Sequence, residues 1–266
     1  VMNHLSGWDQ SVDPHAWQPL PTVLERHHEN RRVLTISLGK YRGTGLTEAA
    51  LRGGDFVDAV GYNARVTYAL EALSSRTPTT VYLYWGEIDA AGHRYGVGSD
   101  EWLQQLEELN SALKRLAERA PAWAALFVTA DHGMVNVPEH QRIDYSGVEE
   151  LTRNIAMTAG EPRAVHLYLE DTSEAARTAT AQRWAQYWGE RAWVIDSREL
   201  MRAGYFGPVI TDAARGRIGD LMVCARDDWA LYDMRHYQER ALHMVGQHGS
   251  LTDAERLVPL RMLKTF

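Results

Sequence analysis

The sequence is poor in cysteine, has no long apolar run and carries fewer basic than acidic side chains. Its one cysteine, Cys224, excludes a framework of intrachain disulfides and favours a reducing compartment, so we expect a cytoplasmic protein. No apolar stretch approaches the roughly 20 residues of a membrane-spanning helix, and no signal peptide is visible, so we expect no membrane partner. The formal net charge of -7 argues against a nucleic-acid polymer as a partner.

What is present fits an ordinary globular protein, with 45% hydrophobic and 24% charged residues. A chain of 266 residues is long enough for one large domain with an inserted lobe. Three short apolar runs, at 33–38, 80–85 and 124–129, have the length and the residue types of buried strands. Helical patterns separate them, near 56–75 and from a Ser99 N-cap onward.

This alternation predicts an α/β fold, a mainly parallel sheet sandwiched by helices, with all three strands in one sheet. The pattern changes after residue 135, where we expect a strand at 165–169, a helix at 173–188, a strand at 193–196 and a hairpin joining 220–225 to 229–233. We therefore predict a single domain over 1–266 with a small α+β lobe inserted at 140–245. The closing stretch 251–263 is expected to return to the main sheet.

Three polar motifs lie where strands or loops end, and they carry the candidate metal ligands. Asp89 and His93 are four residues apart, so on a helix they share one face. Asp131 and His132 follow the 124–129 strand, and His248 stands between two glycines. Carboxylates and imidazoles are typical ligands of a catalytic divalent ion. A lone Asp-His pair is usually structural, but three such motifs together predict that these five side chains bind two metal ions.

The motifs D-A-A-G-H at 89–93, T-A-D-H-G-M at 129–134 and G-Q-H-G-S-L-T at 246–252 resemble those of the alkaline phosphatase superfamily. Within it, the chain is similar to the type I phosphodiesterase/nucleotide pyrophosphatase family, whose closing segment resembles residues 255–260. The resemblance implies an alkaline-phosphatase-like fold and hydrolysis of a small phosphate ester or nucleotide. It implies that Asp89, His93 and His248 hold one metal, and that Asp131 and His132 hold the second. Both ions are usually zinc in the family, and manganese in some members.

One part of the family pattern is not recognisable in this sequence. Members begin with a strand that ends in a further Asp ligand, followed by a helix that bears a Thr or Ser nucleophile. Asp9 and Asp13 follow no apolar run, and Thr44 and Thr47 lie in a glycine-rich loop. The chain also opens on Val1 rather than Met. We therefore expect the nucleophile upstream of this chain, and we expect residues 1–266 alone not to turn over substrate.

Other interpretations stay open at this point. A phosphomonoesterase, a phosphonoacetate hydrolase or a metal-dependent mutase would share the same metal core. A metal-binding remnant without catalysis is a different class, supported by the unassigned nucleophile. Arg163, His166 and the stretch from His236 to His243 are expected at the surface rather than against substrate.

Overall fold

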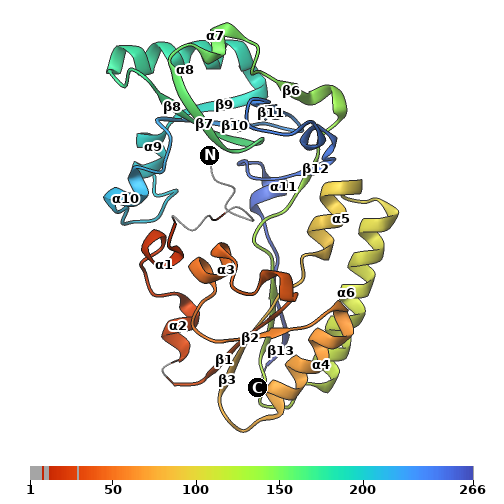
Figure 1. Ribbon diagram of the computed structural model, residues 1–266. Coiled ribbons are helices and arrows are strands. Elements are labelled where there is room, and N and C mark those ends of the chain that lie inside the picture. Colours follow the sequence, from red (N-terminus) through yellow and green to blue (C-terminus); the bar gives the residue numbers. More distant parts are fainter. Residues whose placement is uncertain (1–7, 9–11, 29, 266) are drawn as a thin grey trace. The chain divides into compact units, whose positions relative to one another are not determined.

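The computed structural model describes residue 8, residues 12–28 and residues 30–265, and it divides the chain into two compact units (Figure 1). The first unit comprises Val1–Ile88, Leu103–Val128 and Leu260–Phe266, and the second comprises Asp89–Trp102 and Thr129–Pro259. No helix in the described part of the chain is both long and apolar enough to cross a bilayer.

A three-stranded parallel sheet of order β2-β1-β3 lies at the centre of the first unit (Figure 1). Its strands are β1 (Arg32–Ser37), β2 (Asp55–Asp58) and β3 (Thr79–Leu83). In β1, five of the six residues are buried, as expected for the central strand of a covered parallel sheet. The helices of this unit are α1 (Pro14–Trp17), α2 (Val23–His28), α3 (Gly45–Ala50), α4 (Gly61–Ser74) and most of α6 (Asp100–Arg119).

The α/β class and the small parallel sheet are confirmed, but the prediction of one sheet holding all three apolar runs is wrong. Strand β4 (Leu126–Thr129) pairs with β13 (Leu260–Lys264) in a separate two-stranded sheet. The closing stretch therefore joins β4 rather than the main sheet. An alternation of strands and helices identifies strands, but pairing depends on which edges tertiary packing brings within hydrogen-bonding distance.

The expected 56–75 helix also needs correction, because its first residues form β2 and α4 begins only at Gly61. Gly61 has a φ of 77°, which separates the strand from the helix at a position that favours glycine. The core of this unit lies between the sheet and helices α4 and α6. Its buried members are Leu34, Ile36, Ala59, Val66, Ala69, Ala72, Ala112 and Leu116.

Helix α6 follows its predicted start, because the Ser99 hydroxyl accepts the Trp102 N–H at 3.2 Å. Its apolar stripe is buried only toward the C-terminal end. Leu116 is buried, whereas Leu103 is 43% exposed.

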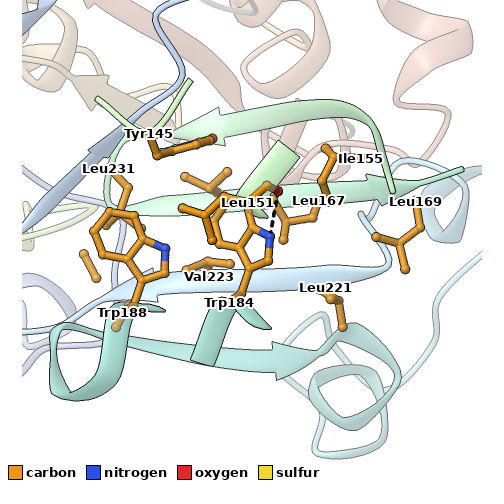
Figure 2. Close-up of a cluster of buried hydrophobic side chains, with 13 residues drawn as sticks. Tyr145, Leu151, Ile155, Leu167, Leu169, Trp184, Trp188, Leu221, Val223 and Leu231 are labelled. Carbon is orange, nitrogen blue, oxygen red and sulfur yellow. Dashed lines mark hydrogen bonds between the residues drawn. The ribbon is translucent and has the colours of Figure 1, made fainter. Parts of the chain in front are cut away.

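The second unit is built on a four-stranded antiparallel sheet of order β7-β8-β10-β9. Two tryptophans of α8, Trp184 and Trp188, are buried in its core, and the Trp184 indole N–H donates to the Leu151 carbonyl at 3.0 Å (Figure 2). Burial of two indoles makes this cluster the largest apolar contribution to the stability of the unit. The sheet strands are β7 (Ile155–Glu161), β8 (Ala164–Leu169), β9 (Ala192–Asp196) and β10 (Leu221–Ala225).

The expected hairpin of 220–225 with 229–233 does not form. β10 pairs with β8 and β9, while β11 (Ala230–Tyr232) pairs in parallel with β6 (Arg142–Asp144). The turn between them includes Asp227 with a φ of 44°, and the chain enters a second sheet there. The remaining elements are α5 (Glu87–Tyr95), β5 (Val135–Asn136), α7 (Glu149–Thr152), α8 (Glu174–Trp188), α9 (Ser197–Arg202), α10 (Asp212–Arg215), β12 (Gly246–Gln247) and α11 (Asp253–Arg256). The lobe boundaries of 140–245 stay a prediction.

Candidate metal centre

The five predicted ligands all lie in the second unit, on three separate segments. Helix α5 carries Asp89 and His93 one turn apart, and the His93 Nε2 lies 3.3 Å from the Asp89 Oδ1. The spacing of four residues therefore places a carboxylate and an imidazole on one helical face, as the sequence predicts.

A short ladder brings the other two motifs together. β5 follows the loop of Asp131 and His132, and β12 precedes His248, and these two strands pair antiparallel with Gly246 opposite Asn136. The His132 and His248 rings stack with their centroids 3.5 Å apart and an interplanar angle of 16°. Residues more than a hundred positions apart in the sequence therefore present two imidazoles side by side.

Two glycines allow α5 to approach this ladder. A Cβ on Gly246 would lie 2.3 Å from the Gly92 carbonyl oxygen, and a Cβ on Gly92 would lie 2.5 Å from the Met134 Sδ. Glycine at both positions therefore leaves room for the two backbones to approach closely. Any larger residue at Gly246 would push His248 away from Asp89 and His93.

The Asp89 Oδ1 is the geometric centre of the cluster. Besides the His93 Nε2, it faces the His248 Nε2 at 3.9 Å and the His132 Nε2 at 4.0 Å. This oxygen is buried and has no hydrogen-bond partner among the described residues. One ligand atom from each of Asp89, His93 and His248 lies within 4.8 Å of the others. A divalent cation would satisfy the unpaired carboxylate oxygen and the nitrogen lone pairs together, so the donor set fits a metal.

Hydrogen bonds on the far side of two rings prepare the imidazoles for this role. The His93 Nδ1 lies 2.8 Å from the Gly246 carbonyl, and the His132 Nδ1 lies 2.8 Å from the Gly133 carbonyl. A carbonyl only accepts, so in the neutral ring Nδ1 carries the proton and Nε2 keeps its lone pair. Burial, with a smaller effect of the neighbouring His132 and His93, lowers the pKa of His248 to about 4. A neutral His248 at physiological pH is therefore available as a ligand.

Asp131 occupies a more open position than the other four. Its side chain is 79% exposed, and its Oδ1 lies 3.8 Å from the His132 Nε2. Asp131 and His132 are thus adjacent at the edge of the cluster. That the five side chains are ligands, and that they hold two ions, stays a prediction.

The remaining sequence candidates take structural roles. Arg163 is fully buried, so its expected surface position is wrong, because its guanidinium pairs with Glu255 inside the second unit. Thr44 is the N-cap of α3 and accepts from the Thr47 N–H. Asp13 caps α1 in the same way, and Asp9 lies outside the described residues.

The His166 ring is partly buried, and burial lowers its pKa. Its Nδ1 accepts the Gly219 N–H at 3.1 Å, which fixes the ring to a neighbouring loop. The roles of Arg163 and Glu255 are not predicted from the sequence alone. The closing segment that resembles the family contains Glu255, which was the available signal.

The model of the family "Type I phosphodiesterase / nucleotide pyrophosphatase" matches residues 2–251. The chain belongs to this family. It is therefore a member of the alkaline phosphatase superfamily, as its motifs predict. A bis(5'-adenosyl)-triphosphatase of Bos taurus is 31% identical to this chain over 101 residues, which are 35% of this chain and 22% of the bovine protein.

Solved structures of the superfamily share the fold. Murine ectonucleotide pyrophosphatase/phosphodiesterase 5 superposes with a TM-score of 0.62 at 16% identity, over 92% of this chain and 62% of the murine one. Another structure of the murine protein is an inactive variant in complex with AMP. Phosphonoacetate hydrolase from Sinorhizobium meliloti 1021 superposes with a TM-score of 0.60 at 18% identity, over 91% of this chain and 68% of that one. This chain thus spans less than two thirds of the murine protein and about a fifth of the bovine one.

Proposed function

We propose that this chain carries the metal-binding half of a phosphodiesterase/nucleotide pyrophosphatase site, which hydrolyses a small phosphate ester or nucleotide with two divalent ions. The observation that carries the proposal is the buried Asp89 Oδ1, which three imidazole nitrogens face and which accepts no hydrogen bond within the described part of the chain. Family membership supports the chemistry, because members of this family typically use divalent metals. The AMP bound to the murine relative supports a nucleotide substrate.

The chain's own residues have defined tasks in this proposal. Asp89, His93 and His248 would hold one ion, and Asp131 with His132 would hold the other. Bound divalent ions would supply charge stabilisation at the phosphoryl group and a lowered pKa of the attacking hydroxyl. The carbonyls of Gly133 and Gly246 hold the Nδ1 protons of two rings, so those rings bind through Nε2 and do not act as proton shuttles.

The assignment of the attacking hydroxyl rests on the sequence resemblance. We expect a Thr or Ser upstream of Val1 to serve, together with one further Asp ligand. Thr44 is a poor candidate, because its hydroxyl is already engaged with the Tyr41 carbonyl at 3.1 Å and the Thr47 hydroxyl at 3.0 Å. Zinc is the expected metal and manganese the alternative.

A comparison of ester substrates tests the function. The complete gene product and residues 1–266 are each stripped with a chelator, reloaded with zinc or manganese, and assayed with a nitrophenyl nucleotide diester. We expect the complete product to cleave the diester faster than nitrophenyl phosphate, and His248→Ala to lose at least a hundredfold in rate. His140→Asn is the matched control, since His140 is an exposed histidine outside the cluster. Metal-independent cleavage, or full activity of His248→Ala, would contradict the proposal.

The same assay separates the alternatives. Preference for nitrophenyl phosphate would indicate a phosphomonoesterase, and release of phosphate from phosphonoacetate would indicate the reaction of the Sinorhizobium relative. A protein that binds metal but turns over none of these compounds would be a mutase or a non-catalytic relative. Diester activity of residues 1–266 alone would refute the upstream nucleophile.

A further inference from the structure

A buried carboxylate connects the two histidine loops of the metal centre. Glu255 lies on α11, is 2% exposed, and accepts hydrogen bonds on both oxygens. Its Oε1 accepts the Ser250 N–H at 3.0 Å, two residues after His248, and its Oε2 accepts the Thr252 hydroxyl. The side chain of Glu255 therefore fixes the conformation of the loop that follows His248.

The main chain of the same residue holds the other loop. The Glu255 carbonyl accepts the Gly133 N–H at 2.7 Å, directly after His132. A Cβ on Gly133 would lie 1.9 Å from the Ala254 carbonyl oxygen, so this approach of the loop to α11 requires glycine. One residue thus contacts both loops whose imidazoles stack at the metal centre.

The guanidinium of Arg163 anchors Glu255 from behind. The Nε donates to Oε1 at 2.7 Å and the Nη2 donates to Oε2 at 2.8 Å, in a bidentate pair that is buried on both sides. The Arg163 Nη1 also donates to the Trp229 carbonyl, and the Nη2 donates to the Asp227 carbonyl at 2.9 Å. All three guanidinium nitrogens of Arg163 therefore donate a hydrogen bond, as a buried charge requires.

We propose that Glu255 is a positioning residue, which with Arg163 holds the loops of His132 and His248 in the positions that their bound cations need. The inference rests on the proposed function for the identity of the centre, but its test is metal affinity rather than turnover. A well-packed apolar pair in place of Arg163 and Glu255 would often give the same stability. Only the carboxylate, however, accepts hydrogen bonds from both Arg163 and the Ser250 amide. Contacts behind ligating residues typically change metal affinity by about 10–100-fold when removed.

The test uses Glu255→Gln and the double variant Arg163→Met/Glu255→Leu in the complete gene product. The double variant removes both buried charges at similar volume, so it avoids the destabilisation that Glu255→Gln causes by leaving the buried Arg163 without its carboxylate. Zinc affinity is measured by competition with a chelator, and hydrogen exchange is measured at the Ser250 and Gly133 amides. We expect zinc affinity to fall at least tenfold in both variants, with faster exchange at Ser250.

Asp220→Asn is the matched control in the same unit. Asp220 pairs with Arg177 at 2.7 Å and accepts the Leu169 N–H, but neither contact involves a histidine loop. It is expected to lose stability while its zinc affinity stays within twofold of the parent. Parental zinc affinity and parental amide protection in both Glu255 variants would overturn the inference. If the parent binds zinc but hydrolyses no ester, the proposed function fails, and the zinc affinities of the variants still decide the role of Glu255. If the parent binds no zinc, unchanged amide exchange at Ser250 in the variants overturns the positioning role of Glu255.

Discussion

At the scale of single residues, the candidate metal centre depends on one buried carboxylate oxygen and on three glycines beside it. The buried Asp89 Oδ1 accepts no hydrogen bond from any residue that the structure describes, which costs free energy unless a cation binds. Gly133, Gly246 and Gly92 have no side chain where a Cβ would collide with neighbouring atoms. The lack of a side chain at these three positions is therefore as necessary to the geometry of the centre as the imidazoles are.

We predict that Asp89→Asn removes metal-dependent stabilisation without unfolding the metal-free protein. Zinc at about a hundred times its dissociation constant stabilises a protein that binds it by about 2.7 kcal/mol. Thermal unfolding with and without zinc should show this gain in the parent and in His140→Asn, and no gain in Asp89→Asn. A variant that keeps the full zinc-dependent gain would exclude Asp89 as a ligand.

Gly133→Ala is predicted to destabilise the second unit by about 1–3 kcal/mol, the usual cost of overpacking. The added methyl would meet the Ala254 carbonyl and would break the Gly133 N–H bond to Glu255. Gly147→Ala is the control, because nothing lies within 4 Å of its Cβ position. Denaturant unfolding measures both variants, and equal midpoints would show that the loop relaxes freely.

At the scale of elements, caps and ion pairs fix where helices begin. The Thr44 side chain starts α3, and the Ser173 side chain starts α8 by accepting the Ala176 N–H. In the first unit, Arg65 of α4 is buried and donates to both Glu87 oxygens, at 2.9 Å and 2.7 Å, at the first residue of α5. This pair fixes the start of the helix that carries Asp89 and His93.

Thr44→Ala should lower the free energy of unfolding by about 1 kcal/mol through the lost cap, and Thr44→Ser should restore it. Diester hydrolysis by the complete gene product should be unchanged in both variants, since the hydroxyl is assigned to helix capping. Loss of hydrolysis in Thr44→Ala at a temperature where it is fully folded would instead identify Thr44 as the nucleophile.

Glu87→Gln should destabilise the first unit in a pH-dependent way. Burial alone would raise the pKa of Glu87, but the hydrogen bonds and charge of Arg65 outweigh it and hold the pKa below the usual 4.5. A carboxyl with a lowered folded pKa stabilises the fold above its unfolded pKa, and this stability is lost as the pH falls through the folded value. The variant should therefore be less stable by about 1.5–3 kcal/mol at pH 7, the usual contribution of hydrogen bonds to a charged group, with a difference that closes below about pH 4. Urea unfolding across that range measures it, and a gap that is independent of pH would exclude the charge of Glu87 as the cause.

At the scale of the whole molecule, the two units have separate apolar cores. The first is built around α4 and the parallel sheet, and the second around Trp184 and Trp188. All five predicted ligands belong to the second unit. Metal binding should therefore directly raise the stability of the second unit.

We predict two calorimetric transitions, of which zinc raises only one. The metal stabilises the second unit by mass action, because its ligands come together only when that unit is folded. Glu87→Gln should lower the other transition, which identifies it as the first unit. A single transition that shifts as a whole with zinc would show that the two units unfold cooperatively.

The sequence by itself determined the family and the α/β class, and it predicted the ligand set, because each of these follows from local sequence patterns. Asp89 and His93 are related by helical periodicity, and strands are recognisable from short apolar runs. Only the tertiary structure decided which strands pair, since β4 pairs with β13 and β11 pairs with β6, not with strands adjacent to them in the sequence. It alone revealed the buried Arg163–Glu255 pair as well, because no periodicity links residues ninety positions apart and a buried charge is recognised only from the partner that neutralises it.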